Sequence, residues 1–167
     1  MTRLLHTWFR RTGLIAVLSL AALGLLIARA PERSSEDPDP AALTRMVAER
    51  AATLANLPAD AGPLRRAEAE TMLADAQRTL AQLDGAPGAA EAALELYVLA
   101  GRRLRSAAGS RQDLLGHVEL HRGEVLTLLG RHRRAAAAYR SAIGAFSAAG
   151  QPVLAEVAQR RLSERSP

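Results

Sequence analysis

The chain has 167 residues, no cysteine, 3% aromatic residues and a formal net charge of +5, and all 22 of its basic residues are arginine. Without cysteine it has no disulfide, no thiol nucleophile and no cysteine-ligated zinc, and so few aromatics disfavour a β-sandwich. Alanine, the best helix former, supplies 36 residues. The composition therefore predicts an all-α chain.

The N-terminus carries an apolar segment that predicts contact with a membrane. Residues 14–28 are uncharged and almost wholly apolar. Extended from Thr12, the run has 17 residues, about 25 Å of helix at about 1.5 Å per residue, which is the short end of what crosses a bilayer. Ala28-Arg29-Ala30 has the form of a signal peptidase site, but Pro31 would impede cleavage there. We expect residues 1–29 to be an uncleaved signal anchor, with a cleaved signal peptide as the alternative.

The charges around this segment predict its orientation. Three arginines precede the apolar run and two follow it closely, so the positive-inside rule places the N-terminus in the cytoplasm. The pair Arg10-Arg11 fits a twin-arginine export signal poorly, because Phe9 and Gly13 depart from that pattern. We expect a single-pass protein of the inner or cell membrane with its C-terminal domain in the periplasm or outside the cell.

A tether and one leading helix follow the anchor. Residues 30–40 are rich in proline, serine and acids and lack apolar periodicity, so they predict a flexible linker. Asp39 can cap a helix that has Pro40 at its first position, and Pro58 ends that helix. The leading helix and its turn therefore occupy residues 41–62.

Residues 63–167 are expected to form a helical repeat domain. Apolar periodicity and glycine or proline breaks predict five more helices, at about 63–83, 89–108, 110–129, 131–149 and 152–163. Loops of a few residues favour a stack of antiparallel helices over one long coiled coil.

Two of these segments share an internal repeat. Small, aromatic and small residues recur 42 positions apart, and Ser106–Gly109 recurs 41 positions later as Ser147–Gly150. The three matched pairs are Ala93 with Ala135, Tyr97 with Tyr139, and Ala100 with Ala142.

This order of residues resembles the tetratricopeptide repeat (TPR) family, in which small residues let paired helices approach and an aromatic fills the space behind them. Six residues occupy the family's places in register: Gly123, Leu126, Gly130, Ala135, Tyr139 and Ala142. Ala93, Tyr97 and Ala100 match only the second helix of the preceding pair. Glu119 and Arg122 depart from the pattern, because the family usually buries Trp or Leu there; three residues apart, they are expected to pair on the surface.

The resemblance implies an all-α fold of stacked antiparallel hairpins, a short TPR-like solenoid after one transmembrane helix, and a concave groove that binds a peptide. The implied groove residues are His117, Leu120, His121, Glu124, Thr127 and Leu128. Some family members clamp a carboxyl-terminal peptide with Lys, Asn and Arg. His117, His121 and Glu124 stand at such places here, so a different ligand is expected.

The same helix face could carry other chemistry. His117, His121 and Glu124, at i, i+4 and i+7, have the residue types of a divalent-metal site, whereas the simpler interpretation is a solvated face on which Glu124 pairs with His121. We predict no metal and no cofactor. With no triad, phosphate loop or carboxylate pair in view, we also predict no enzymatic activity.

Charge divides the chain into an acidic and a basic part. Residues 31–95 sum to −6 and residues 96–167 to +7. Three arginine clusters near helix ends would oppose the helix dipoles or meet an anionic partner: Arg102, Arg103 and Arg105; Arg131, Arg133 and Arg134; and Arg160, Arg161 and Arg165. Nucleic acid is disfavoured by the expected location and the few aromatics. An acidic protein, lipid headgroups or the acidic half of a second copy remain as partners.

These observations predict a membrane-tethered scaffold or adaptor that binds another protein in a groove. The alternative is a structural helical-bundle subunit of an envelope complex. A scaffold requires an open face around residues 117–128, whereas a closed bundle would bury Leu120 and Leu128 against the helix of residues 40–57.

Overall fold

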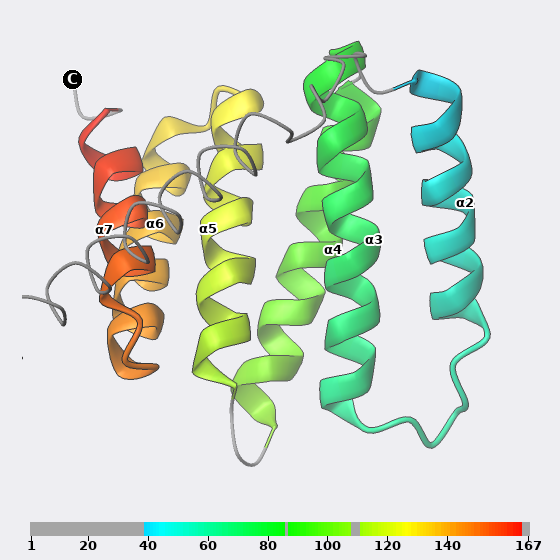
Figure 1. Cartoon of the computed structure of the whole chain (residues 1–167), viewed down its shortest axis with the longest axis horizontal. Coiled ribbons are helices and arrows are strands. Elements are labelled where there is room, and N and C mark those ends of the chain that lie inside the picture. Colours follow the sequence, from blue (N-terminus) through cyan, green and yellow to red (C-terminus); the bar gives the residue numbers. More distant parts are fainter. Residues whose placement is uncertain (1–38, 86, 108–110, 165–167) are drawn as a thin grey trace, which may run out of the picture. The chain divides into compact units, whose positions relative to one another are not determined.

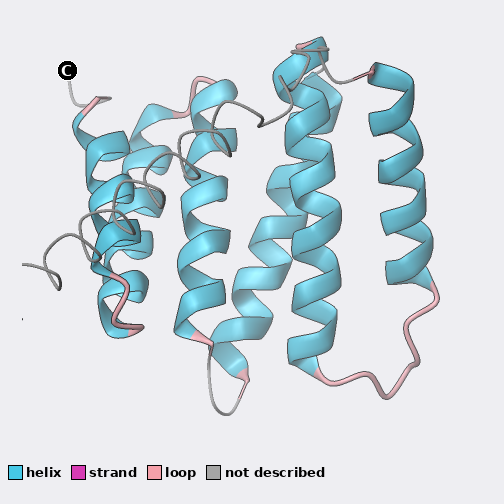
Figure 2. Cartoon of the chain, in the orientation of Figure 1, coloured by secondary structure: helices cyan, strands magenta, loops and turns pink. Residues whose placement is uncertain are grey.

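A computed structural model describes residues 39–85, 87–107 and 111–164, which contain α-helices and no strand (Figure 2). The all-α class expected from the composition is confirmed for this part of the chain. Its helices are α2 (Pro40–Ala55), α3 (Pro63–Asp84), α4 (Pro87–Ser106), α5 (Gln112–Leu128), α6 (His132–Ala148) and α7 (Pro152–Ser163).

The chain divides into two units between residues 37 and 38, and the described residues belong to the second. The predicted anchor at residues 1–29 and all but the last residues of the predicted linker lie outside the described part of the chain. Among the described residues, none of the helices has the length and apolar character needed to cross a bilayer.

Local sequence accounts for the helix ends. Asp39 accepts a hydrogen bond from the Ala41 amide at 3.0 Å, and Pro40 opens α2 as expected. Gly130 has a φ of +70° and ends α5, where the Arg131 amide donates to the Leu126 carbonyl at 2.8 Å. Gly150 ends α6 in the same way. This left-handed glycine cap satisfies carbonyls that would otherwise be unpaired.

Neighbouring helices pack in chain order. The most extensive packing joins α3 to α4 and α5 to α6, while α4 packs on α5, α6 on α7 and α2 on α3. In Figure 1, α3 and α5 lie in a near layer and α4 and α6 behind them. The chain therefore forms two hairpins, α3–α4 and α5–α6, with α2 and α7 at the two ends of the stack.

Small side chains build most of the core. More than half of the buried apolar residues are alanines, and the largest fully buried side chains are those of Tyr97, Tyr139 and Phe146. A Cβ placed on Gly123 would lie 2.5 Å from the ring of Tyr139, and one on Gly116 would lie 2.5 Å from the ring of Phe146. These two glycines let α5 approach α6 closely enough for aromatic rings to pack against its backbone.

The residues singled out for repeat packing lie at the hairpin interfaces. Ala93, Tyr97 and Ala100 of α4 are fully buried, and their counterparts in α6 are at most 2% exposed. Leu126 is 3% exposed and belongs to the same core.

Glu119 corrects one expectation from the sequence. It does pair with Arg122, at 3.1 Å, but the prediction of a surface pair is wrong, because Glu119 is only 1% exposed. Arg105 of α4 donates to the same carboxylate at 2.8 Å. The buried carboxylate at position 119 is therefore neutralised by guanidinium groups of two helices, α4 and α5.

Candidate functional site

The candidate site is the face of α3 and α5 that looks away from α4 and α6, which we call the inner face and define by Thr71, Asp75, His117, His121, Glu124 and Leu128. It holds two cavities. The larger, of about 370 Å³, is lined by Glu68, Thr71, Met72, Asp75, His117 and His121 among others. The smaller, of about 120 Å³, is lined by Gln82, Glu124, Thr127, Leu128, Tyr139 and Arg161.

Five of the six groove residues expected from the resemblance line these cavities. His117 and His121 line the larger cavity, and Glu124, Thr127 and Leu128 line the smaller one. Leu120 lines neither, because it is 6% exposed and belongs to the core. Leu128 is 49% exposed.

Glu124 is the point where three helices meet on the inner face. Its carboxylate lies 3.1 Å from the Arg78 guanidinium of α3, 3.0 Å from Nδ1 of His121, and 4.0 Å from the Arg161 guanidinium of α7. Burial opposes ionisation of Glu124, but the His121 hydrogen bond and the neighbouring positive charges outweigh it and lower the pKa. Glu124 is therefore an anion that fastens α3, α5 and α7 together.

A second polar contact ties α4 to the same face. The Tyr97 hydroxyl donates to Oδ1 of Asp75 at 2.5 Å, and Asp75 lies 4.0 Å from Arg78. Burial, together with the negative charge of Asp75, raises the pKa of Tyr97, so the phenol stays protonated as the donor. The network thus runs from Tyr97 through Asp75 and Arg78 to Glu124.

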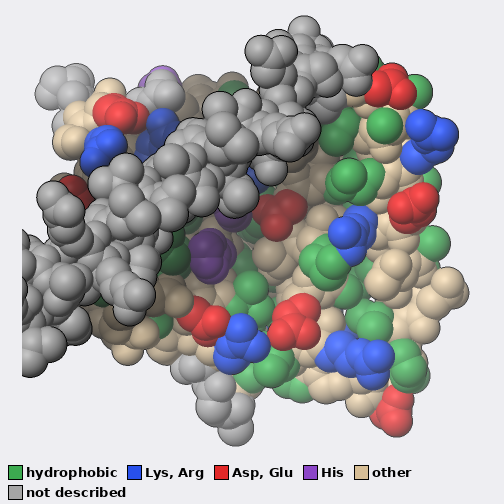
Figure 3. Space-filling view, in the orientation of Figure 1, with side chains coloured by type: hydrophobic (Ala, Val, Ile, Leu, Met, Phe, Trp, Pro, Cys, Tyr) green, Lys and Arg blue, Asp and Glu red, His purple; other side chains and the backbone are tan. Residues whose placement is uncertain are grey.

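The two histidines lie against each other in the larger cavity. The rings of His117 and His121 are 6.2 Å apart and inclined by 26°, and His117 meets the ring of Phe146 edge-on at 5.2 Å. Burial and the charge of His121 lower the pKa of His117, which favours its neutral form near pH 7. Histidine side chains reach the surface of this face beside acidic and basic ones (Figure 3).

Asp75, His121 and Glu124 are engaged in the polar network of the inner face. Across the described ranges no three histidine, aspartate or glutamate side chains group as metal ligands would. What the face offers a ligand is a row of hydrogen-bonding groups between two exposed apolar side chains, Met72 and Leu128, which are 43% and 49% exposed.

Sequence reasoning missed the partners that lie on other helices. Arg78, Asp75 and Arg161 complete the network, yet Arg78 stands 46 positions from Glu124 in the chain. The pairings of Glu124 with His121 and of Arg78 with Asp75, each three positions apart, could be anticipated from local spacing.

Comparison with known families, with curated proteins and with solved structures gives no match to this chain.

Proposed function

We propose that this chain is a membrane-tethered adaptor with a TPR-like stack of helical hairpins, which holds a segment of another protein against its inner face. Residues 1–29 would anchor it, and the helical domain would lie in the periplasm or outside the cell. We propose no catalytic role.

One observation carries this proposal: the inner face is uncovered in the described part of the chain. Helix α2, the segment that could have filled the groove, packs on α3. Leu128 stays about half exposed instead of being buried against α2. Apolar side chains left open beside fixed polar groups are what an extended or helical peptide requires of its receptor.

The order of packing also supports a TPR-like stack. Two extensively packed hairpins with lesser packing between them are the arrangement that a short solenoid requires. In such a stack the first helices of the hairpins, here α3 and α5, line one common surface.

A structural role within an envelope complex is the second candidate, and one feature favours it. The carboxylate of Glu124 pairs with Arg78 and thereby joins α5 to α3, and it also engages His121 of its own helix. A face whose charges are satisfied internally could serve mainly to hold the stack together.

Crosslinking in cells separates the two roles. A photoreactive residue at Leu128 should capture a protein partner, whereas the same residue at Ala148, exposed near the end of α6, should not. Introducing Met72→Glu should reduce capture from position 128 if one segment lies along the whole face. Capture only of residues 40–57 of the same chain would contradict the adaptor and favour the structural role.

The membrane topology has a clean test because the chain contains no cysteine. Ala148→Cys in the full chain should react with a membrane-impermeant maleimide when the outer membrane or cell wall is permeabilised and the inner membrane is left intact. Reaction only after the inner membrane is lysed would place the domain in the cytoplasm and overturn this part of the proposal.

A further inference from the structure

A second hollow lies on the opposite side of α5 from the inner face. We call it the outer groove and define it by its lining residues, which come from α4, α5 and α6: Leu94, Val98, Arg122, Leu126, Arg134 and Ala137. Its volume of about 300 Å³ is at the lower end of the range of ligand pockets. Leu94 and Leu126 are buried, whereas Arg134 and Ala137 are exposed, so the groove has an apolar floor and a basic rim.

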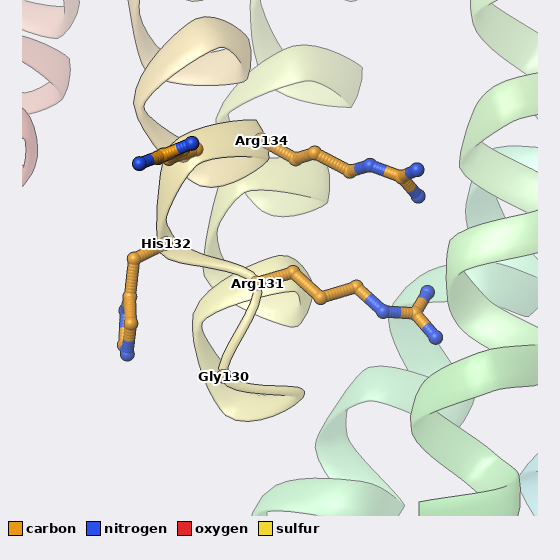
Figure 4. A pocket seen from close by; sticks show the side chains of 5 residues that line it. Gly130, Arg131, His132 and Arg134 are labelled. Atoms are coloured by element: carbon orange, nitrogen blue, oxygen red, sulfur yellow. The ribbon is translucent and has the colours of Figure 1, made fainter.

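The outer groove continues into a basic pocket at the turn between α5 and α6. This pocket, of about 460 Å³, is lined by residues 130–134 and shares Arg134 with the groove. Arg131 and Arg134 extend in the same direction from the start of α6, and His132 points away from them (Figure 4). Arg131 is held by Glu91 of α4 at 2.6 Å, whereas Arg134 has no such partner among the described residues.

The positive charge around the groove is not balanced by the described part of the chain. Within the described residues, Arg122 and Arg131 form ion pairs. Arg133, Arg134 and Arg140 of α6 form none there. Arg140 lies one helical turn beyond Ala137, on the same side of α6. Arg102 of α4, one turn beyond Val98, also lacks a carboxylate partner within the described ranges. Unpaired arginines at the rim of an apolar hollow attract carboxylates, which guanidinium groups bind in a bidentate way.

We propose that the outer groove docks an acidic segment of another protein, inserting at least one large apolar side chain over Leu94 and Leu126 while its carboxylates meet Arg134 and Arg140. Charge complementarity identifies this partner, since Arg134 and Arg140 have no carboxylate partner among the described residues. A lipid surface fits less well, because a flat layer of headgroups could meet the arginines but could not fill a hollow floored by leucines. The proposal is independent of the inner-face function.

Fluorescence anisotropy on the full chain in a non-ionic detergent tests this directly. The probe is a short fluorescein-labelled peptide of glutamate and leucine, compared with one peptide in which serine replaces leucine and one in which lysine replaces glutamate. We expect only the first to bind well, with an affinity that falls as salt is raised.

The variant Arg134→Glu with Arg140→Glu should weaken binding of the glutamate–leucine peptide by at least about tenfold. The matched control is Arg45→Glu with Arg65→Glu, two exposed arginines of α2 and α3 that also lack carboxylate partners in the described structure. It removes the same charge and should leave the affinity within about twofold, since it lies outside the groove. Because neither variant breaks an ion pair, both should keep the helical circular dichroism of the parent chain.

Two results would overturn the proposal. Equal binding of the serine peptide would show that charge alone is recognised, as a headgroup layer would do. Equal weakening by the two double variants would show a response to net charge and no specific groove.

Discussion

The hairpins α3–α4 and α5–α6 bury tyrosines at matching places but hold them differently. Tyr97 donates a hydrogen bond to the Asp75 carboxylate at 2.5 Å. Tyr139 lies 3.3 Å from the Thr127 hydroxyl, and its ring packs on the bare backbone of Gly123. One hairpin is fixed by a charged hydrogen bond and the other by close approach. The tyrosine ring therefore occupies the same place in both hairpins, but different contacts fix it there.

The first helices of the two hairpins differ in a related way. Each buries one glutamate, Glu70 in α3 and Glu119 in α5, at 4% and 1% exposure. Arg103 binds Glu70 within the first hairpin at 2.8 Å. Glu119 instead receives Arg105 from the preceding hairpin as well as Arg122 from its own helix, so it also fastens one hairpin to the next.

The largest loss of stability should come from removing both arginines that pair with Glu119. Arg105→Ala with Arg122→Ala leaves a buried carboxylate uncompensated, which typically costs about 3–5 kcal/mol of unfolding free energy. Urea unfolding followed by circular dichroism measures it. Glu119→Leu is the control and should cost much less, because the arginines it leaves behind, Arg105 and Arg122, have side chains 48% and 21% exposed and can be hydrated. A loss below about 1 kcal/mol in the double variant would contradict the assigned role of the arginines.

The tyrosine comparison predicts unequal costs for one identical change. Tyr97→Phe should lose about 1.5–3 kcal/mol, because it removes a short hydrogen bond to a charged group. Tyr139→Phe should lose less than Tyr97→Phe, since the contact of the Tyr139 hydroxyl with Thr127 is long and between neutral groups. Equal losses in thermal unfolding would mean that the two hairpins do not differ in this way.

The close approach of α5 and α6 can be tested with glycine. Gly123→Ala should cost about 1–3 kcal/mol by forcing the ring of Tyr139 to move. Gly144→Ala is the matched control within α6. Nothing lies within 4 Å of its added Cβ, so it should gain about 0.5–1 kcal/mol of helix stability. Stabilisation by both changes would show that the ring has room to shift.

The smallest effect concerns pH. In the folded chain the pKa of His117 is lower than its ordinary value of 6.5. As the pH falls, the unfolded chain therefore takes up the proton more readily than the folded chain does, and the free energy of unfolding should decrease below about pH 6.5. The lowered pKa of Glu124 acts in the same direction at more acidic pH. Denaturation midpoints of the parent and His117→Gln should converge as the pH falls from 7 toward 5, with the variant showing the shallower slope.

Helix ends were predictable from the sequence because their causes are local. Glycine at φ near +70° and proline in the first turn act within a few residues, and the observed ends of α5 and α6 differ by one or two residues from those expected. The tyrosines at Tyr97 and Tyr139 were recognisable because their spacing repeats.

The polar network was not predictable, since it depends on which helices become neighbours. Arg105 and Glu119 stand 14 positions apart, and Tyr97 and Asp75 stand 22 apart. A carboxylate at position 119 has the chemistry of a surface residue, and only the packing of α4 on α5 places it inside. Leu120 is in the core for a similar reason: it lies between Gly116 and Gly123 on the face of α5 that packs on α6.

Helix α2 is the helix that we expect to unfold most easily. Among the described helices its extensive packing is on α3, and it has one buried residue, Leu43, so its amide hydrogens should exchange earlier than those of α5. Its sixteen residues span about 24 Å as a helix and up to about 55 Å when extended. If residues 1–29 anchor the chain as proposed, tension would unfold α2 before the hairpins, and the proposed binding faces would gain about 30 Å of reach without losing their shape.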